Sequence, residues 1–138
     1  MATPHDAELI LKLYDLRREP VMRQSRVDVQ AKFVPKTFDE LLAVTRAEHP
    51  LNTAYRMVSS YWEMAAGFVK HGALDVELFS ENCAEGLFLF AKVEPFLAEL
   101  REKTSPYAYQ NMELVVSRSA VAKARLEIFR KRVAGMKK

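Results

Sequence analysis

The chain has few glycines and a single cysteine, and each shortage excludes a class of site. Its four glycines are scattered, whereas glycine-rich phosphate loops need several close together for the backbone to approach a phosphate. One cysteine, Cys83, allows neither an internal disulfide nor a thiolate metal cluster. The N-terminus lacks a signal-peptide pattern, and charges and a proline interrupt the most apolar window, 87–100. We therefore expect a cytoplasmic protein without a membrane span.

Positive charge is concentrated at the C-terminus. Residues 1–48 are neutral overall, residues 49–117 carry a net charge of −4, and residues 118–138 carry +7. Clustered basic side chains can contact phosphates, so the segment 118–138 is a candidate surface for nucleic acid or another anionic surface. The candidate contacts are Arg118, Lys123, Arg125, Arg130, Lys131 and Arg132. The alternative is an amphipathic helix with solvated basic flanks, because these residues are spread around the helix.

Apolar periodicity and capping signals predict an all-α chain, folded as a compact antiparallel bundle of five to seven helices with proline-marked kinks. The strongest pattern covers 52–71 and ends at Gly72, where a left-handed C-cap glycine belongs. Helix starts are predicted from capping residues and prolines at Thr3-Pro4, Thr37, Asp75 and Ser105-Pro106.

The remaining segments give weaker signals. Residues 20–34 alternate like a strand from Val27 to Phe33, but a lone strand lacks a partner, so we predict a helix and keep an extended segment as the alternative. The last helix is expected over 119–133. One helical domain would then span 1–134, followed by a frayed basic tail at 135–138.

The stretch from Tyr61 to Phe79 gathers residues that could hold a metal. Zinc needs three or four converging ligands, and the candidates here are Glu63, His71, Asp75 and Cys83. However, Glu63 falls on a polar helix face and Cys83 on an apolar one. The favoured interpretation is a solvated Glu63, a helix-end His71, a capping Asp75 and a buried Cys83. We predict no metal, no cofactor and no catalytic residues.

Glutamates recur at helical spacing after this stretch. Glu77, Glu81 and Glu85 would share one face of a continuous helix. A row of like charges on a polar face does not provide the two unlike environments that acid–base pairs need. The row is either solvated without a partner or pairs with the basic last helix.

The run Leu87-Phe88-Leu89-Phe90 is apolar on every side of its helix. It could lie in the core, at an oligomer interface or beside an apolar pocket. Because four large apolar groups are hard to cover in one small domain, a homodimer is expected. The candidate pocket or interface residues are Trp62, Phe79, Leu87, Phe88 and Phe90.

The stretch Y-W-E-M-A-A-G-F-V-K-H-G-A-L-D-V-E-L-F, with the later K-V-E-P-F and N-M-E, resembles a family of small bacterial helical proteins classed as a domain of unknown function. The resemblance covers roughly the middle half of the chain and leaves the basic last helix unmatched. It implies a helical fold and identifies no functional residues.

Three functions are compatible with these features. The leading hypothesis is a self-associating interaction or regulatory module rather than an enzyme. The second is a nucleic-acid or anionic-surface binder that uses 118–138. The third is a helical bundle that binds a small molecule near Trp62, Phe79 and Phe90.

Overall fold

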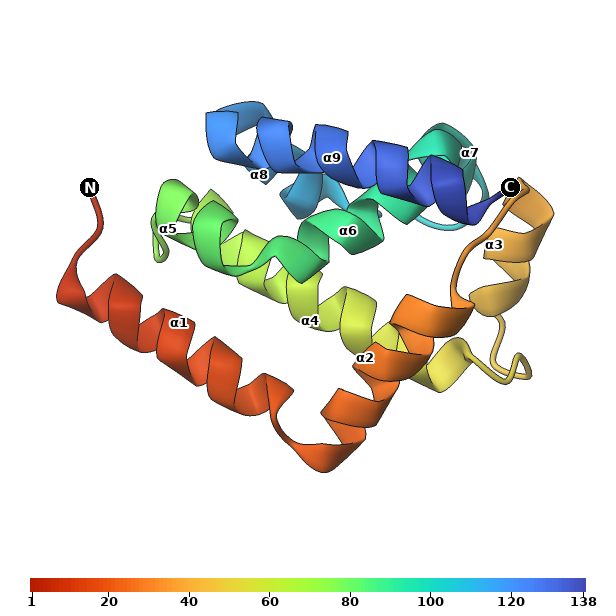
Figure 1. Cartoon of the computed structure of the whole chain (residues 1–138), viewed down its shortest axis with the longest axis horizontal. Coiled ribbons are helices and arrows are strands. Elements are labelled where there is room, and N and C mark those ends of the chain that lie inside the picture. Colours follow the sequence, from red (N-terminus) through yellow and green to blue (C-terminus); the bar gives the residue numbers. More distant parts are fainter.

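The computed structural model describes all 138 residues, and every regular element in it is a helix (Figure 1). The elements are α1 (Pro4–Arg17), α2 (Pro20–Lys32), α3 (Phe38–Val44), α4 (Asn52–Lys70), α5 (Val76–Asn82), α6 (Ala84–Val93), the 3₁₀ helix η1 (Glu94–Phe96), α7 (Leu97–Lys103), α8 (Gln110–Arg118) and α9 (Ala120–Met136). The all-α class is confirmed, but five to seven helices were too few. The ambiguous segment 20–34 forms α2.

Helix α4 is the centre of the fold. It packs against α2 on one side and α8 on the other, while α6 packs against α9. In Figure 1, α1 and α2 diverge from a short connection as the two arms of a V, with α9 on the far side of the molecule. Tyr61 of α4 donates a hydrogen bond to the Leu13 carbonyl, which ties α1 to the central helix.

The core is built around Trp62, whose side chain is only 1% exposed. Its ring makes edge contacts with Tyr61 and Phe79, at centroid distances of 4.8 and 6.4 Å. Gly86 of α6 lies directly on this ring, where a Cβ atom would come within 3.2 Å of two ring carbons. Trp62, a candidate pocket or interface residue from the sequence, is therefore a core residue, and its packing depends on a glycine in the facing helix.

Two predicted helix boundaries are confirmed. Helix α4 ends at Lys70, and Gly72 follows with φ 77°, the left-handed conformation that favours glycine after a helix. Asp75 accepts a hydrogen bond from the Leu78 backbone N–H and so caps α5, as predicted.

The predicted helix start at Ser105-Pro106 is wrong. Helix α8 begins at Gln110, after Tyr109 in a left-handed conformation with φ 57°. Tyr109 provides no side-chain cap; instead, the Glu63 carboxylate of α4 accepts from the backbone N–H groups of Asn111 and Met112 at 2.8 and 3.0 Å. The helix therefore starts where a distant carboxylate meets its N-terminus.

The acidic segment after Asp75 is two helices rather than one. Cys83, with φ −126° and ψ 49°, interrupts the helix between α5 and α6. At the other end of the chain, α9 continues to Met136, beyond the predicted end at Val133. None of the helices is both long enough and apolar enough to cross a membrane.

Candidate anion-binding site

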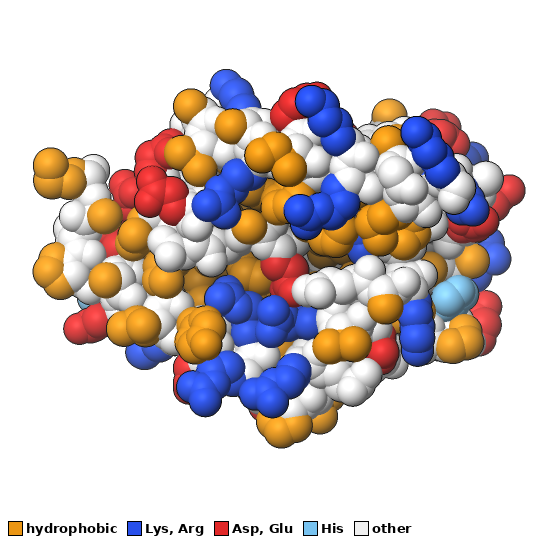
Figure 2. Space-filling model, viewed as in Figure 1, with side chains coloured by type: hydrophobic (Ala, Val, Ile, Leu, Met, Phe, Trp, Pro, Cys, Tyr) orange, Lys and Arg blue, Asp and Glu red, His pale blue; other side chains and the backbone are white.

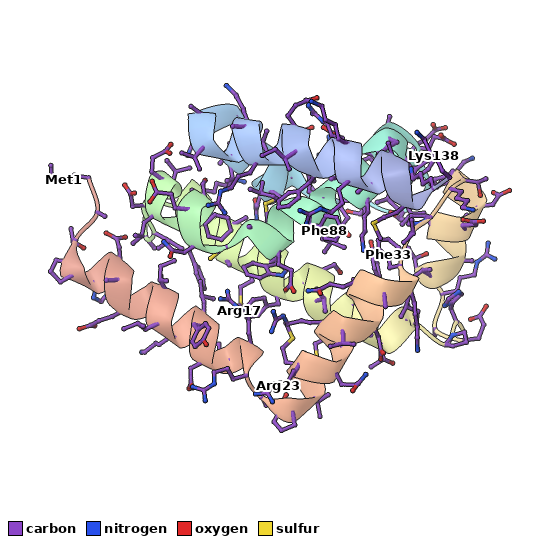
Figure 3. All side chains as sticks on the ribbon, viewed as in Figure 1. Met1, Arg17, Arg23, Phe33, Phe88 and Lys138 are labelled. Atoms are coloured by element: carbon purple, nitrogen blue, oxygen red, sulfur yellow. The ribbon has the colours of Figure 1, made fainter.

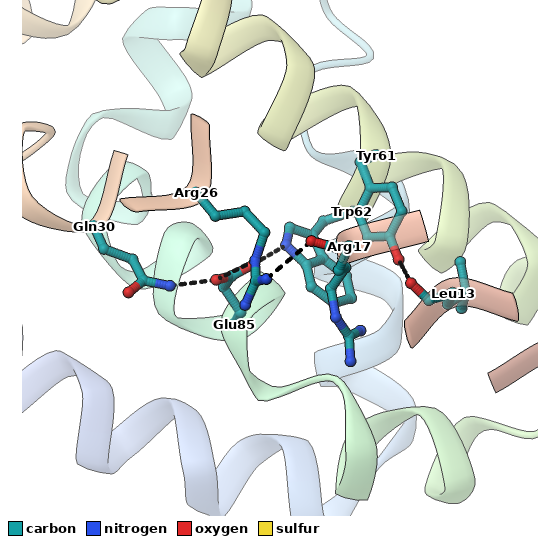
Figure 4. A network of polar contacts seen from close by, with 7 residues as sticks. All are labelled: Leu13, Arg17, Arg26, Gln30, Tyr61, Trp62 and Glu85. Carbon is teal, nitrogen blue, oxygen red and sulfur yellow. Dashed lines mark hydrogen bonds and ion pairs between the residues drawn. The ribbon is translucent and has the colours of Figure 1, made fainter. Parts of the chain in front are cut away.

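A polar network joins α2, α4 and α6 around the Glu85 carboxylate (Figure 4). Arg26 Nε donates to both carboxylate oxygens at 3.0 and 2.9 Å, and Gln30 Nε2 donates to one of them. Trp62 Nε1 donates to the other oxygen at 3.0 Å. One half-buried carboxylate on α6 therefore connects α6 to both α2 and α4.

This network corrects the sequence interpretation of the glutamate row. Because the helix breaks at Cys83, Glu85 turns toward α2, while Glu77 and Glu81 form no ion pair. On α9, Arg130 pairs with Glu94 and Glu127 at 2.6 and 2.9 Å. The alternative in which the glutamate row pairs with the basic last helix is therefore wrong.

A basic pocket lies beside this network, in the V between α1 and α2. It has a volume of about 440 Å³, and four arginines line it: Arg17, Arg18, Arg23 and Arg26. Gln30 lines its inner end, and the only apolar lining residues are Tyr14 on α1 and Val27 on α2. Figure 2 shows lysine and arginine side chains gathered where the two helices approach each other. In Figure 3, Arg17 lies inside the V and Arg23 near its apex.

Local sequence explains why the arginines converge. Arg17 ends α1 and Arg18 is its C-cap, where positive charge stabilises the negative end of the helix dipole. Pro20 then starts α2, with the Glu19 carboxylate accepting from the Val21 and Met22 N–H groups at 3.0 and 2.8 Å. These two hydrogen bonds lower the pKa of Glu19. The sharp turn brings the first residues of α2 beside the last residues of α1.

Only one of the four arginines has an anionic partner. Arg26 pairs with Glu85, whereas Arg17, Arg18 and Arg23 form no ion pair with any carboxylate within 4.0 Å. Arg23 Nη2 donates instead to the Arg18 carbonyl at 3.1 Å. Arg26 Nη1 reaches the Arg17 carbonyl at 3.3 Å. The pocket thus contains three guanidinium groups whose charge no protein carboxylate neutralises by direct contact.

Arg17 forms the inner wall of the pocket. Its guanidinium lies 5.1 Å from the centroid of the Trp62 ring and 5.6 Å from that of Tyr14. Its Nη1 atom is buried and has no hydrogen-bond acceptor. A buried donor without an acceptor is costly, and the polar neighbours of Arg17 in the interior are the Tyr61 hydroxyl and the Cys83 thiol.

Lys92 lies behind the network, with 1% of its surface exposed. Its Nζ donates to the carbonyls of Val29 and Gln30 at 3.2 and 3.3 Å, at the C-terminal end of α2, and lies 4.6 Å from the Phe88 ring centroid. Burial lowers the pKa of Lys92 to about 8, although the charge of Glu85 acts in the opposite direction. The interior side of the site therefore also carries positive charge.

A second and more open hollow, about 630 Å³ in volume, lies between α4 and Ala108-Tyr109. Arg56 is its only cationic lining residue, and both carboxylate oxygens of Glu63 there are occupied by α8. Its size exceeds that of the basic pocket, but it lacks a comparable group of unpaired charges. The basic pocket is therefore the better candidate site.

The predicted site residues are distributed as follows. Trp62, Phe79, Leu87 and Phe90 are buried in the core, and Phe88 is half-buried against Phe129 at a centroid distance of 5.4 Å. On α9, Arg132 lies over the rings of Phe88 and Phe129, and Lys123 and Lys131 are exposed. Arg118 is also exposed, but it is the last residue of α8. Arg125 is half-buried. The structure does not gather the α9 cations around one hollow.

The four residues weighed as metal ligands have separate surroundings. Glu63 is not solvated as predicted, because it caps α8; burial raises its pKa, and the two backbone hydrogen bonds act against that rise. Asp75 caps α5, Cys83 is buried, and His71 is exposed at the end of α4. No group of three or more histidine, cysteine or acidic side chains is arranged to hold a metal.

One protein-family model matches most of the chain. A model described as a domain of unknown function, DUF4760, matches residues 2–119. This chain belongs to that family. No curated protein and no solved structure matches the chain. The DUF4760 match extends well beyond the middle half indicated by the sequence resemblance and includes the whole α1–α2 pocket. It ends at Ser119, the residue that caps α9, so the basic last helix lies outside it.

Sequence reasoning missed the arginines of this DUF4760 domain. They occupy four of the ten positions from Arg17 to Arg26, but acidic residues, among them the nearby Asp15, Glu19 and Asp28, leave residues 1–48 neutral overall. A count over a short window on either side of Pro20 would have found the cluster. That their side chains share one pocket follows from the turn between α1 and α2, which composition does not specify.

Proposed function

We propose that this protein is a ligand-binding module that holds a phosphate-bearing small molecule in the α1–α2 pocket. The proposal rests on one observation: three arginines without carboxylate partners surround one hollow. The planar guanidinium presents several N–H donors in a fixed fork, which matches the oxygens of a phosphate. Three such groups favour a ligand with two or more negative charges.

The surroundings of the pocket support a regulatory or interaction role for the bound form. Arg26 and Gln30 belong both to the pocket lining and to the network around Glu85. Arg17 lies both in the pocket and on the ring of Trp62. A ligand that engages these side chains would therefore reinforce the contact of α1 and α2 with the central helix.

Inorganic pyrophosphate is the first probe, because it offers phosphate oxygens alone. Titration followed by calorimetry and by fluorescence of Trp62, the single tryptophan, should show saturable binding that weakens as salt is raised. Replacing both Arg18 and Arg23 by glutamine should weaken binding at least about tenfold, because two charge-assisted contacts are lost.

The matched control replaces Lys123 and Lys131 of α9 by glutamine, which removes the same net charge from exposed positions outside the pocket. It should leave pyrophosphate binding nearly unchanged. Equal losses in the two double variants would show that binding follows overall charge and would contradict a defined site. The absence of any saturable signal in the unmodified protein would also refute the proposal.

Self-association stays a prediction. The run Leu87-Phe88-Leu89-Phe90, on which the prediction of a homodimer rested, has three buried members and one half-buried member within a single chain. Light scattering at several protein concentrations tests the dimer, and a strict monomer would contradict it. Nucleic-acid binding through α9 likewise stays a prediction, tested by the affinity of the Lys123/Lys131 variant for DNA and RNA at low salt.

A further inference from the structure

The two apolar residues of the basic pocket lie on opposite arms of the V. Tyr14 belongs to α1 and Val27 to α2, and both line the same hollow as the arginines. Both side chains are 53% exposed, so neither is explained by core packing. The pocket therefore combines a cationic lining with an apolar surface on each helix.

The Tyr14 ring is already oriented by two cations. The guanidinium groups of Arg17 and Arg18 lie 5.6 and 5.9 Å from its centroid. Cation–π contacts of this kind hold the ring in place while leaving about half of its surface exposed. An exposed, oriented aromatic ring beside arginines is a surface on which a nucleobase can stack, because every base presents a flat π face.

Building on the proposed phosphate-binding function, we infer that the ligand is a mononucleotide. Its phosphate contacts Arg17, Arg18 and Arg23, and its base lies against Tyr14 with Val27 on the opposite side. The hollow of about 440 Å³ is within the range of small-molecule sites and is bounded by one turn and two helices. A phosphorylated sugar without a base would use the arginines and leave the apolar surfaces exposed.

The test compares three probes that differ by one chemical part: adenosine 5′-monophosphate, ribose 5-phosphate and adenosine. Calorimetry should show that the nucleotide binds about 5- to 150-fold more tightly than ribose 5-phosphate, the range expected for stacking one base. Tyr14→Leu should abolish that difference, and the two probes are compared within the variant because loss of the ring also removes its contacts with Arg17 and Arg18. Tyr14→Phe should retain the difference, since the aromatic face remains.

The outcomes separate this inference from the proposed function. Equal binding of the nucleotide and ribose 5-phosphate would overturn the inference and leave phosphate binding intact. No binding of either phosphate, or of pyrophosphate, would refute both. Adenosine binding as tightly as the nucleotide would overturn the role given to the arginines. Much tighter binding of a single-stranded oligonucleotide, with a steep salt dependence, would replace the mononucleotide with nucleic acid.

Discussion

The buried lysine behind the pocket makes the stability of this protein depend on pH. The Lys92 ammonium is almost fully buried, and burial lowers its pKa from an ordinary value of 10.5 to about 8. Between these two pKa values the unfolded chain binds a proton that the folded chain has released. The free energy of unfolding should therefore rise as pH increases through this window.

The size of the effect follows from the two pKa values. Each tenfold difference in proton affinity between the folded and unfolded chains corresponds to about 1.4 kcal/mol, and integration from pH 7 to pH 9.5 gives a gain of about 2 kcal/mol. The measurements stay below pH 10 to avoid ionisation of the tyrosines. Burial raises the pKa values of Tyr55 and Tyr61, to about 12 for Tyr61, so these two residues lower the stability only at higher pH. Burial also raises the pKa of the Cys83 thiol, but that contribution is common to every variant compared.

The decisive measurement compares the unmodified protein with Lys92→Met by urea unfolding at pH 7 and pH 9.5. Two effects oppose each other in this variant at pH 7, because a desolvated charge is removed while the Val29 and Gln30 carbonyls lose a donor. The change in relative stability between pH 7 and pH 9.5 is free of this ambiguity, because it depends on the titration of Lys92 alone. The stability of the unmodified protein relative to Lys92→Met should increase by about 2 kcal/mol from pH 7 to pH 9.5.

Lys123→Met at an exposed site is the control, and its stability should run parallel to that of the unmodified protein. If Lys92→Met also runs parallel, the lysine is solvated in the folded state and the reasoning fails.

Two further substitutions test the packing of the central helix. Glu63→Ala should lower the free energy of unfolding by about 2 kcal/mol, because two N–H groups at the start of α8 lose their acceptor. Glu63→Gln should lower it by less, because the amide oxygen still accepts. Urea unfolding of both variants measures the difference. Gly86→Ala should cost about 1 kcal/mol despite the better helix propensity of alanine. Its Cβ would lie 2.8 Å from the Met112 methyl group, which must move, and 3.2 Å from the Trp62 ring, which the hydrogen bond to Glu85 holds in place. A stabilised Gly86→Ala protein would show that both Met112 and the ring can move aside.

Local signals in the sequence predicted the helices well where each signal acts within a few residues. Thr3 caps α1 through the Asp6 N–H, Thr37 caps α3 through the Glu40 N–H, and Gly72 terminates α4. These features depend on neighbours along the chain, so the sequence carries them directly. The same locality explains the failure at Ser105-Pro106, because the actual cap of α8 comes from Glu63, 48 positions away from Asn111.

The sequence by itself determined that this chain is helical, that Gly72 ends its central helix and that its last helix is basic. Only the tertiary structure decided that Glu85 faces Arg26 and not α9, since a single break at Cys83 redirects one residue of an otherwise regular row. It also decided that four arginines flanking Pro20 share one pocket. Helix formation depends on contacts within a turn, whereas the partners of a charged side chain depend on how distant helices cross.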